Sequence, residues 1–497
     1  MRCTTLVSLA VAVAVAQSLA VPVSPNEEPS AITKRDLQGL IDSLRDGIEL
    51  DDIKQSVLPD FLSWDYTTNE IQEKLGMGGI ILDRLPMEFL NIPGYANYSN
   101  GQWVLRIHGQ SYKQALPING EPSPVSQSAL DNAANVFLPD VDIAELPSNE
   151  QANARNLTSA VLSIPQGDVS LDFTVRISST QPQSDFPSTG GWENRFTWPR
   201  RTDSRGEIDG FVSLYSTASG QLPSGQTSDG IVRLDITTPS TSTGNATAYL
   251  VPPEGYTILS DIDDILRVTK IYTPKEGLLN TFARDFVPWL NMPEIFATWA
   301  SQHPDNPYHF HYLTTTPEQA TRMYEDFIYA TYPQGSFDTR PLNFTTFDQT
   351  FNVRRTLLNK ILETFPRRRF ILVGDTTNSD VMTHYPAVAQ EFPNVHCILM
   401  RNTSATDPEN RFPYNTKGFK ELDERRYMFF RTPEDLRGLD FGRGDCRKPG
   451  LEERVSGGWM GLPWGGERGD AAAAGGKEKV WWVVYAAVGV VGIMTGF

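Results

Sequence analysis

From residue 251 onward, short apolar runs alternate with stretches of helical spacing, and this alternation constrains the fold more than any other feature of the sequence. The apolar runs are predicted strands and the stretches between them are predicted helices. Continuous apolar strands that alternate with helices are typical of a parallel sheet covered on both faces. We therefore predict an α/β domain over residues 251–440, built as a three-layer, doubly wound parallel sheet. The predicted strands are 256–259, 310–313, 370–373 and 395–400, and the predicted helices are 277–300, 317–330 and 352–365.

Residues 100–250 have a different texture, because short alternating runs of apolar and polar residues are separated by clusters of Gly, Pro, Ser and Asn. Such alternation predicts half-buried strands in a mostly antiparallel β domain. We therefore predict a β-rich, sandwich-like module over residues 100–250. Residues 36–99 carry apolar side chains at three- and four-residue spacing and are predicted to form a helical N-terminal region. A hydrophobic content of 39% is sufficient for packed cores.

The two ends of the chain resemble targeting signals. Residues 1–20 have a basic start, an apolar stretch and small residues at the end, which is typical of a removable signal peptide. Residues 21–35 end in a Lys-Arg pair and are predicted to be a propeptide. After a predicted flexible tail, residues 441–479, the chain finishes with an uncharged apolar segment, residues 480–497. Small residues, a polar spacer and an apolar end are typical of a glycolipid (GPI) anchor signal, with a membrane-spanning helix or a wrongly assigned gene end as alternatives.

Export would give a meaning to two other features of the sequence. It contains five Asn-x-Ser/Thr glycosylation sequons and three cysteines. Removal of the signal peptide would leave Cys397 and Cys446, which are able to pair in an oxidising compartment, although the sequence does not show whether they are close enough. We expect a secreted glycoprotein that is anchored at the cell surface. The sequons are at Asn97, Asn156, Asn245, Asn343 and Asn402.

Charge and short motifs exclude several classes of function. A net charge of −17 argues against nucleic acid as a partner, because phosphate backbones are bound by clustered positive charge. The chain has no GxSxG, GxxxxGK or CxxC motif, which disfavours a serine hydrolase, a P-loop nucleotidase and a thiol oxidoreductase. Its six histidines show no metal-binding spacing. Two arginine clusters, 200–201 and 367–369, are either solvated faces or contacts for an anionic membrane surface.

Acidic residues follow two of the predicted strands, at the point where each strand ends. Asp261 and Asp263 come directly after strand 256–259, and Asp375, followed by Asp380, comes after strand 370–373. The carboxyl ends of parallel strands meet at one edge of a sheet, where ligands of such sheets bind. Four carboxylates gathered there would repel one another without a cation between them. Because oxygen ligands beside a phosphate suit Mg²⁺, we predict a magnesium site formed by these four residues.

This arrangement suits the transfer of a phosphoryl group. Asp261 is the predicted nucleophile, which would form an acyl phosphate that water then hydrolyses. Asp263 is the predicted general acid and base, because it would protonate the leaving oxygen and then activate the water. Thr314, at the end of the next strand, is placed to hydrogen-bond a phosphoryl oxygen. A cation ahead of the last acidic strand, Arg354 or Arg355, would neutralise the transferring group.

The same residues resemble a known family. The segments 260–264, 310–317 and 370–375 are similar to the catalytic domain of the actin-patch phosphatidate phosphatases, which belong to the haloacid-dehalogenase-type hydrolases. The similarity extends from about residue 100 to about residue 435, and the signal peptide would make this chain a secreted, fungal-type member. The resemblance implies a haloacid-dehalogenase-like fold and Mg²⁺-dependent dephosphorylation of phosphatidate to diacylglycerol. It also implies the roles given above, with Arg354 rather than Arg355 as the basic position.

The chain departs from the family pattern at four places. Ile265 stands where the first motif usually has Thr, and residues 314–317 read TTTP instead of SNSP. Arg354 replaces a Lys, which keeps the charge in a bulkier planar group. Thr377 replaces a Gly, and we expect strain in that turn. No departure removes a carboxylate.

Two other functions are compatible with the same residues. The first is a catalytically weak or inactive protein that binds lipid or glycan at the cell surface through its β-rich module. The second is a phosphatase of soluble phosphate esters, because the residues that choose the substrate, about 272–306, are not identified by any motif.

Overall fold

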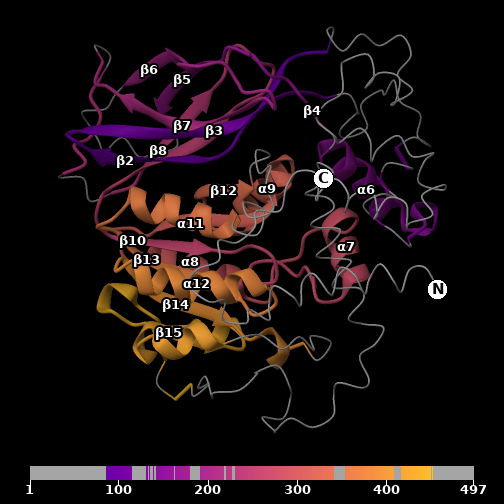
Figure 1. The fold of residues 1–497 in the computed structure, drawn as a ribbon, viewed down its shortest axis with the longest axis vertical. Coiled ribbons are helices and arrows are strands. Elements are labelled where there is room, and N and C mark those ends of the chain that lie inside the picture. The colour runs from indigo at the N-terminus through magenta and orange to yellow at the C-terminus, as the bar shows by residue number, and fades with distance from the viewer. Residues whose placement is uncertain are drawn as a thin grey trace, which may run out of the picture. The chain divides into compact units, whose positions relative to one another are not determined.

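The computed structural model describes residues 85–451 with several gaps, and all of these residues belong to one unit, residues 77–466 (Figure 1). The predicted signal peptide, propeptide and C-terminal apolar segment lie outside the described residues and stay predictions. Most of the predicted helical N-terminal region, 36–99, also lies outside them, but its described end forms the strands β1 Glu88–Asn91 and β2 Gly94–Ser99, so the prediction of helix was wrong there. The predicted flexible tail, 441–479, was wrong at its start, where Phe441 is fully buried and Cys446 is held in a disulfide. Within the described part of the chain, no helix is long and apolar enough to cross a membrane. The gaps are 115–129, 132–133, 135–137, 139–140, 162, 180–190, 218–219, 227–229, 341–352, 408–415 and 449.

The first sheet is mostly antiparallel, as predicted. It has nine strands in the described residues, and β2 and β9 form its single parallel pair there. The long strand β3 organises the sheet, because it pairs with β1, β2, β4 and β7. The strands are β1 Glu88–Asn91, β2 Gly94–Ser99, β3 Gln102–Gln114, β4 Ser163–Pro165, β5 Asp172–Ile177, β6 Glu193–Thr197, β7 Glu207–Leu214, β8 Val232–Thr237 and β9 Ala246–Val251.

The apolar residues of these strands share one core. It includes Phe89, Trp103, Phe173 and Trp192, none of which is more than 2% exposed. Phe89 comes from β1 and Phe173 from β5, near opposite ends of the strand order. The hydrogen-bonded sheet is therefore continuous and curves around its own core.

The second sheet is parallel throughout and has the order β12-β11-β10-β13-β14-β15. The chain begins in the middle with β10, adds β11 and β12 on one side, and then returns to add the other three strands on the other side. The order therefore reverses between β10 and β13, and ligands of open α/β sheets bind beyond the carboxyl ends of the strands at such a switch point. The strands are β10 Tyr256–Ser260, β11 His309–Pro317, β12 Ser336–Arg340, β13 Arg369–Asp375, β14 Val395–Arg401 and β15 Tyr427–Phe430.

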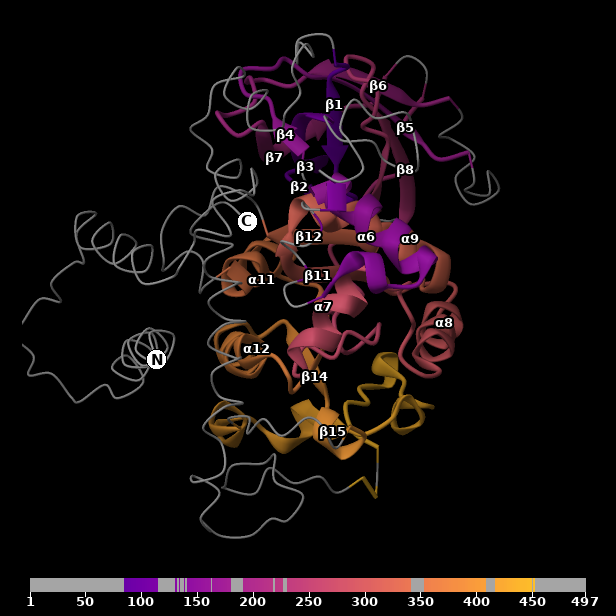
Figure 2. The ribbon, with the colours of Figure 1, turned by 90° about the vertical axis from the view of Figure 1, so that its right-hand side faces the viewer.

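Helices cover both faces of the parallel sheet, as Figure 2 shows. On one face, Phe296 of α8 and Ile328 of α9 pack in an apolar core with strand residues such as Phe310. On the other face, Leu358 of α11 and Met382 of α12 pack in a second core. The predicted α/β domain with a parallel sheet is thereby confirmed. The helices are α6 Ser148–Val161, α7 Pro274–Phe282, α8 Met292–Gln302, α9 Thr321–Thr331, α11 Val353–Thr364 and α12 Ser379–Glu391.

The prediction of one helix over residues 277–300 was wrong. The structure has two helices, α7 and α8, which are separated by residues 283–291. Pro288 lies in this connection, and Leu290 has a left-handed φ of 49°. Neither feature fits the interior of a helix.

A buried ionic network joins the two sheets. The guanidinium of Arg106, in β3, is 1% exposed and lies 2.7 Å from the carboxylate of Asp338 in β12 and 2.8 Å from that of Asp209 in β7. The N–H of Phe337 donates to the carbonyl of Pro93 at 2.8 Å, so the two sheets are also connected through their backbones. Because a buried ion pair tolerates little displacement, this network fixes β12, at the edge of the parallel sheet, against the first sheet.

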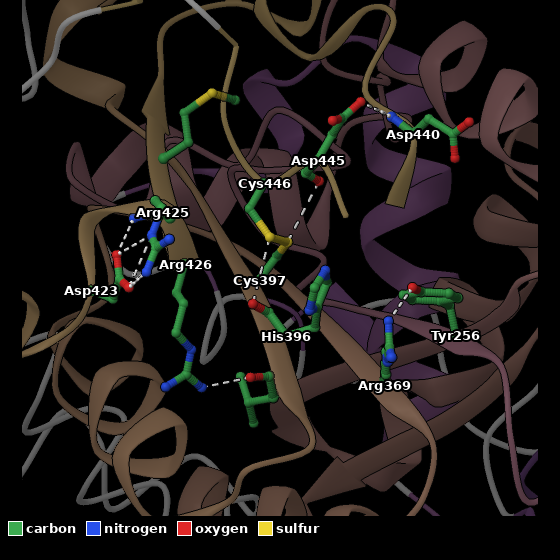
Figure 3. Close-up of a disulfide and its surroundings, with 12 residues drawn as sticks. Tyr256, Arg369, His396, Cys397, Asp423, Arg425, Arg426, Asp440, Asp445 and Cys446 are labelled. Atoms are coloured by element: carbon green, nitrogen blue, oxygen red, sulfur yellow. Dashed lines mark hydrogen bonds and ion pairs between the residues drawn. A yellow bond between two sulfur atoms is a disulfide. The ribbon is translucent and has the colours of Figure 1, made fainter. Parts of the chain in front are cut away.

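The structure joins Cys397 and Cys446 in a disulfide, which the sequence left open (Figure 3). Cys397 lies in β14, so the bond ties the segment after β15 to the parallel sheet. His396 lies close to both sulfur atoms. These sulfur atoms are bonded to each other, and the three residues are therefore not a metal site.

The predicted glycosylation sequons differ in exposure. Asn245 is exposed, whereas Asn402 is 8% exposed and its N–H donates to the carbonyl of Phe430 at 2.7 Å. A glycan on Asn402 would require this region to open, which disfavours that sequon. Asn343 lies outside the described residues.

Candidate active site

Asp261 and Asp375 lie at the switch point of the parallel sheet. Asp261 directly follows β10 and Asp375 is the last residue of the neighbouring strand β13. The N–H of Asp261 donates to the carbonyl of Val373 at 2.9 Å, which continues the pairing of the two strands. The two carboxylates also interact electrostatically. The order of the strands thus brings together two acids that are more than 100 residues apart in sequence.

The carboxylate of Asp261 is 1% exposed and is held by three groups. The N–H of Ile262 donates to Oδ1 at 2.9 Å, the amide of Asn378 donates to Oδ2 at 3.3 Å, and the guanidinium of Arg354 lies 3.2 Å from Oδ2. Burial raises the pKa of Asp261 to about 6, although Arg354 acts in the opposite direction. A further negative charge, such as a phosphoryl group, would therefore need a cation in addition to Arg354 to be stable beside Asp261.

Asp375 is fully buried, and one of its two carboxylate oxygens accepts hydrogen bonds from the described residues while the other does not. The N–H of Thr377 donates to Oδ1 at 2.6 Å, and the hydroxyl of Thr377 donates to the same oxygen. Oδ2 has no hydrogen-bond partner among the described residues. Burial, with the negative charges of Asp264 and Asp261, raises the pKa of Asp375 well above its usual value. A buried carboxylate oxygen without a donor is the position that a cation would stabilise.

Arg354 bridges the carboxylates of Asp261 and Asp380. It is the second residue of α11 and is 1% exposed. Its Nε donates to Asp380 at 2.8 Å, and its Nη2 lies 3.2 Å from the carboxylate of Asp261. Its third nitrogen, Nη1, is buried without a partner among the described residues. Asp380 lies in the first turn of α12 and also accepts from the N–H of Val381 at 2.7 Å. The guanidinium thus has a free buried donor beside the predicted nucleophile.

Asp263 has a different environment from Asp261, because it is surrounded by donors. The Nε of Arg267 and the hydroxyl of Thr269 donate to Oδ1, both at 2.8 Å. The hydroxyl of Tyr324 lies 3.1 Å from Oδ1 and 3.0 Å from Oδ2. These donors fix the orientation of the Asp263 carboxylate, whose side chain is 14% exposed and whose Oδ2 is contacted by Tyr324.

Thr314 reaches the same group of residues through a short chain of hydroxyls. It lies in β11 and is 2% exposed. Its hydroxyl accepts from the N–H of Thr316 at 3.2 Å and donates to the Thr316 hydroxyl at 3.1 Å. The Thr316 hydroxyl lies 3.3 Å from that of Tyr324, which contacts Asp263. The C-terminal part of β11 is therefore connected to Asp263 through Tyr324.

Asp264 is structural. It has a left-handed φ of 54°, and its carboxylate accepts from the N–H groups of Thr269, Lys270 and Ile271 at 3.1, 2.7 and 3.0 Å. Three backbone donors occupy this carboxylate, so it closes the turn that carries Asp261 and Asp263. Burial raises its pKa, which these hydrogen bonds partly oppose.

The six predicted site residues therefore do not form one compact set of ligands. Within the described part of the chain, His396, Cys397 and Cys446 are the one group in which three acidic, His or Cys ligand atoms lie within 4.8 Å of one another. Asp261 and Asp375 converge, whereas Asp380 is engaged by Arg354 and Asp263 by Arg267. Asp261 and Asp375 fit a hard cation, because both are buried oxygen donors with raised pKa values and Asp375 has an oxygen to spare.

Sequence reasoning missed three residues of the site. Arg267 lies four residues after Asp263 and pairs with it across the turn that follows β10, so a cation this near in sequence was a usable signal. Tyr324 and Asn378 reach the site from α9 and from the residue before α12, and no local pattern identifies them. They were found only because the fold brings distant segments together.

A cavity in the described part of the chain lies elsewhere. It has a volume of about 440 Å³ and is lined by residues such as Tyr98, Phe211, Phe365 and Arg367. Pro253, which precedes β10, also lines it, so the cavity lies at the amino ends of the parallel strands. None of the predicted site residues lines this cavity. We therefore do not assign the predicted phosphoryl transfer to it.

Comparison with known proteins agrees with the geometry at the switch point. A family model described as "Phosphatidate phosphatase APP1, catalytic domain" matches the segment from β10 to just beyond β14. Residues 256–402 match this family. The resemblance found in the sequence is thereby confirmed for the segment that carries Asp261, Thr314 and Asp375.

A curated relative supports the same assignment. Phosphatidate phosphatase APP1 of Saccharomyces cerevisiae is 28% identical over 152 residues, which cover 30% of this chain. The matched part spans about a quarter of that relative, 26% of its length. The relative's name and the family together support a phosphatase function for the matched domain.

Similarity to solved structures is weak. A family 2 glycosyl hydrolase from Bacteroides cellulosilyticus is 8% identical with a TM-score of 0.23, over 73% of this chain and 49% of the other. Chitinase ChiW from a Paenibacillus species is 9% identical with a TM-score of 0.16, over 71% of this chain and 31% of the other. Likeness at this level carries no argument about fold or function.

Two departures from the family pattern have a structural explanation. Ile265 is fully buried in the apolar core beneath α8, where a hydroxyl would need its own partner. Thr377 has no left-handed φ, so the expected strain in its turn is absent. Instead, its hydroxyl donates to Asp375, a bond that glycine could not make.

Proposed function

We propose that this chain is a Mg²⁺-dependent phosphatidate phosphatase that acts through an aspartyl-phosphate intermediate. The observation that carries the proposal is the convergence of Asp261 and Asp375 at the switch point, with the unpartnered Nη1 of Arg354 beside them. The match of residues 256–402 to a phosphatidate phosphatase catalytic domain supports the choice of substrate. The products would be diacylglycerol and phosphate.

Arg354 would bind and orient the phosphoryl group. Its Nη1 is a buried donor that lacks a partner, and a phosphoryl oxygen satisfies such a donor with a charge-assisted hydrogen bond. The Asp380 carboxylate fixes the orientation of the guanidinium at 2.8 Å from Nε. The hydroxyl of Thr314, in the neighbouring strand β11, would donate to a phosphoryl oxygen in place of its present acceptor, the Thr316 hydroxyl.

In the first step, an oxygen of Asp261 would attack phosphorus while the bond from phosphorus to the glycerol oxygen breaks. The departing oxygen needs a proton, which Asp263 would supply after its carboxyl group exchanges a present donor, such as Tyr324, for the substrate. In the second step, Asp263 would take a proton from the water that hydrolyses the acyl phosphate. The free Asp261 carboxylate and inorganic phosphate result.

Asp261 and Asp375 would hold the metal ion. When bound, Mg²⁺ supplies positive charge that offsets the repulsion between a carboxylate nucleophile and the phosphoryl oxygens. Asp263 and Asp380, which we predicted as ligands from the sequence, would reach it only after leaving Arg267 and Arg354.

The test is phosphate release from phosphatidate by the purified whole chain. We expect activity with Mg²⁺, loss of activity with EDTA, and a loss of at least about 1,000-fold in kcat for Asp261→Asn, because no other group at the site can take the nucleophile's place. Asp172→Asn, a change at an exposed carboxylate in β5, is the matched control and should leave kcat unchanged. Unchanged activity in Asp261→Asn, or indifference to EDTA, would refute the mechanism.

The same assay separates the alternatives. Equal turnover of phosphatidate and of water-soluble phosphate esters would favour a phosphatase of soluble substrates. No turnover at all, with lipid or glycan binding retained, would favour the catalytically inactive binding protein. One observation favours this second reading: three donors, among them the Arg267 guanidinium, already engage the Asp263 carboxylate that would have to carry the transferred proton.

We also propose that the chain is secreted and attached to the cell surface. The terminal segments support this but lie outside the described residues, and the disulfide between Cys397 and Cys446 is typical of an oxidising compartment.

A further inference from the structure

Residues 284–291, which lie in the connection between α7 and α8, expose two large apolar side chains. Val287 is 55% exposed and Leu290 is 60% exposed. In the described part of the chain, two other large apolar side chains are similarly exposed, Phe211 and Tyr215, at the end of β7 in the first sheet. We call residues 284–291 the apolar loop.

The apolar loop is held in place by its backbone and by buried anchors. The N–H of Val268 donates to the carbonyl of Val287, and the N–H of Trp289 donates to the carbonyl of Leu266, both at 2.9 Å. Trp289 itself is 4% exposed. Leu290 has a φ of 49°, a conformation that costs energy in any residue with a side chain. The exposure of the two apolar side chains therefore belongs to a fixed and strained backbone, and fraying does not explain it.

The apolar loop also borders the candidate active site. The guanidinium of Arg267 lies 3.8 Å from the centre of the Phe286 ring, and the rings of Phe286 and Tyr324 are 5.6 Å apart. Arg267 and Tyr324 are two of the residues that donate to Asp263. The residue next to Val287 thus packs directly on the side chains that surround the predicted general acid.

Charged groups around the apolar loop are already engaged. Arg284 lies 2.5 Å from the carboxylate of Glu276 and 3.7 Å from that of Glu150. Asp285 accepts a hydrogen bond of 2.8 Å from Asn153. The loop therefore offers apolar side chains and no unpaired cation to a partner.

We propose that the apolar loop seats this protein on a lipid bilayer, with Val287 and Leu290 inserted among the acyl chains. This rests on the proposed function, because the phosphate of phosphatidate lies at the bilayer surface and an enzyme must sit there to reach it. Two side chains at one tip are too small an area for a stable protein interface, which buries on the order of 800 Å² on each partner. They are sufficient for insertion, whose strength follows the apolar area removed from water.

The first test is kinetic and uses the whole chain with vesicles that contain phosphatidate. Burying the exposed halves of a Val and a Leu side chain is worth roughly a 30-fold change in partitioning. In the variant Val287→Ser with Leu290→Asn, we expect the vesicle concentration at half-maximal rate to rise by roughly this factor. Asparagine is chosen because it tolerates the left-handed backbone at this position. Turnover of short-chain phosphatidate, dispersed below its critical micelle concentration, should not change.

The matched control is Phe211→Ser with Tyr215→Ser, which removes the other exposed apolar pair. It should leave unchanged both the vesicle concentration at half-maximal rate and the turnover of dispersed short-chain phosphatidate. If the two double variants behave alike on vesicles, or if the loop variant loses turnover of dispersed substrate to the same extent, the inference is overturned.

The second test does not need catalysis, so it separates failure of this inference from failure of the proposed function. A fluorophore attached to Leu290→Cys should brighten and shift to shorter wavelength when phosphatidylcholine vesicles with phosphatidate are added. The same fluorophore on Tyr215→Cys should not. Because the contact is apolar, the response should persist in about 0.5 M salt, which screens charges beyond a few ångströms. No response at Leu290, or a response that salt abolishes, refutes insertion even if the enzyme is active.

Discussion

The buried acids at the switch point predict that the stability of this protein depends on pH and on Mg²⁺ together. The pKa of Asp261 is raised from 3.8 to about 6, and this difference corresponds to about 3 kcal/mol. Because the folded-state pKa is the higher one, the protonated form stabilises the fold. This contribution is fully present below about pH 4 and is lost as the pH rises through about 6. Without metal, Asp261 alone should lower the free energy of unfolding by about 2 kcal/mol between pH 4.5 and 7.5.

Magnesium should reverse this loss at neutral pH. A ligand at 100 times its dissociation constant stabilises the folded state by about 2.7 kcal/mol. For a protein of this size that shift corresponds to about 3 °C in Tm. Carboxylates must lose their protons to bind a cation, so the effect of Mg²⁺ should be clear at pH 7.5 and close to zero at pH 4.5.

The assay is thermal unfolding of the whole chain, followed by circular dichroism at both pH values, with and without about 10 mM Mg²⁺. Asp375→Asn removes one of the two proposed ligands and should abolish the Mg²⁺ response at pH 7.5. Asp261→Asn should also abolish it, and should raise the metal-free Tm at pH 7.5 because a buried charge is gone. Asp172→Asn should respond like the unmodified chain. A Mg²⁺ response that survives in Asp375→Asn, or that is as large at pH 4.5 as at pH 7.5, would refute the reasoning.

Three other predictions concern separate groups. Arg354→Lys keeps the charge but loses the planar fork that bridges two carboxylates, so kcat/KM for phosphatidate should fall about 10- to 100-fold, and Arg354→Met should lose more. Burial and the negative charge of the neighbouring Glu207 both raise the pKa of Glu318 well above its usual value. The protonated form of Glu318 therefore stabilises the fold at low pH, and this stabilisation is lost as the pH rises. Glu318→Gln should increase Tm at pH 8 and leave Tm unchanged at pH 4. An equal change in Tm at both pH values would contradict this. Replacing Cys397 and Cys446 by Ala should lower the free energy of unfolding by roughly 4 kcal/mol in denaturant titrations, because the disulfide closes a loop of 49 residues, and a loss below about 1 kcal/mol would argue against that account.

The parallel sheet and its two acidic ends could be predicted because the signals are local. A strand buried on both faces must be a continuous apolar run, and the residue that ends it is visible in the sequence. Asp261 and Asp375 were found in this way, and the order of the strands then required them to meet. Arg354 was found as one of two candidates, and its neighbour Arg355 turns out to be paired with Glu391 near the other end of α12.

The orientation of Asp263 could not be predicted, because it depends on side chains from distant segments. Tyr324 comes from α9, 61 residues further along the chain, and its hydroxyl reaches Asp263 only when α9 packs on the sheet. The sequence indicated that Asp263 stands beside Asp261. It did not indicate that three donors would turn its carboxylate toward Arg267.

The break between α7 and α8 was missed for a different reason. Apolar residues on both sides of Pro288 keep a spacing that suits one helical face, although the two helices pack in different cores: α8 packs on the parallel sheet, and Leu279 of α7 packs with Ala154 of α6. The proline itself was the usable signal, because it removes a backbone donor and clashes with the preceding turn. That break produces the apolar loop, so the part of the chain that sequence periodicity described least well is the part to which we assign membrane contact.

The boundary predicted at residue 250 separates two sheets but does not separate two independent structures. Arg106 comes from the first sheet, and its closest carboxylate, Asp338, comes from the parallel one. Loss of the Arg106 side chain alone, as in Arg106→Met, would leave Asp338 buried without its guanidinium partner, a change that typically costs about 3–5 kcal/mol. Asp338 lies in β12, which pairs with β11, and β11 carries Thr314. The first sheet therefore supports the edge of the sheet that forms the candidate site, and the catalytic segment matched by the family comparison is not expected to work when separated from it.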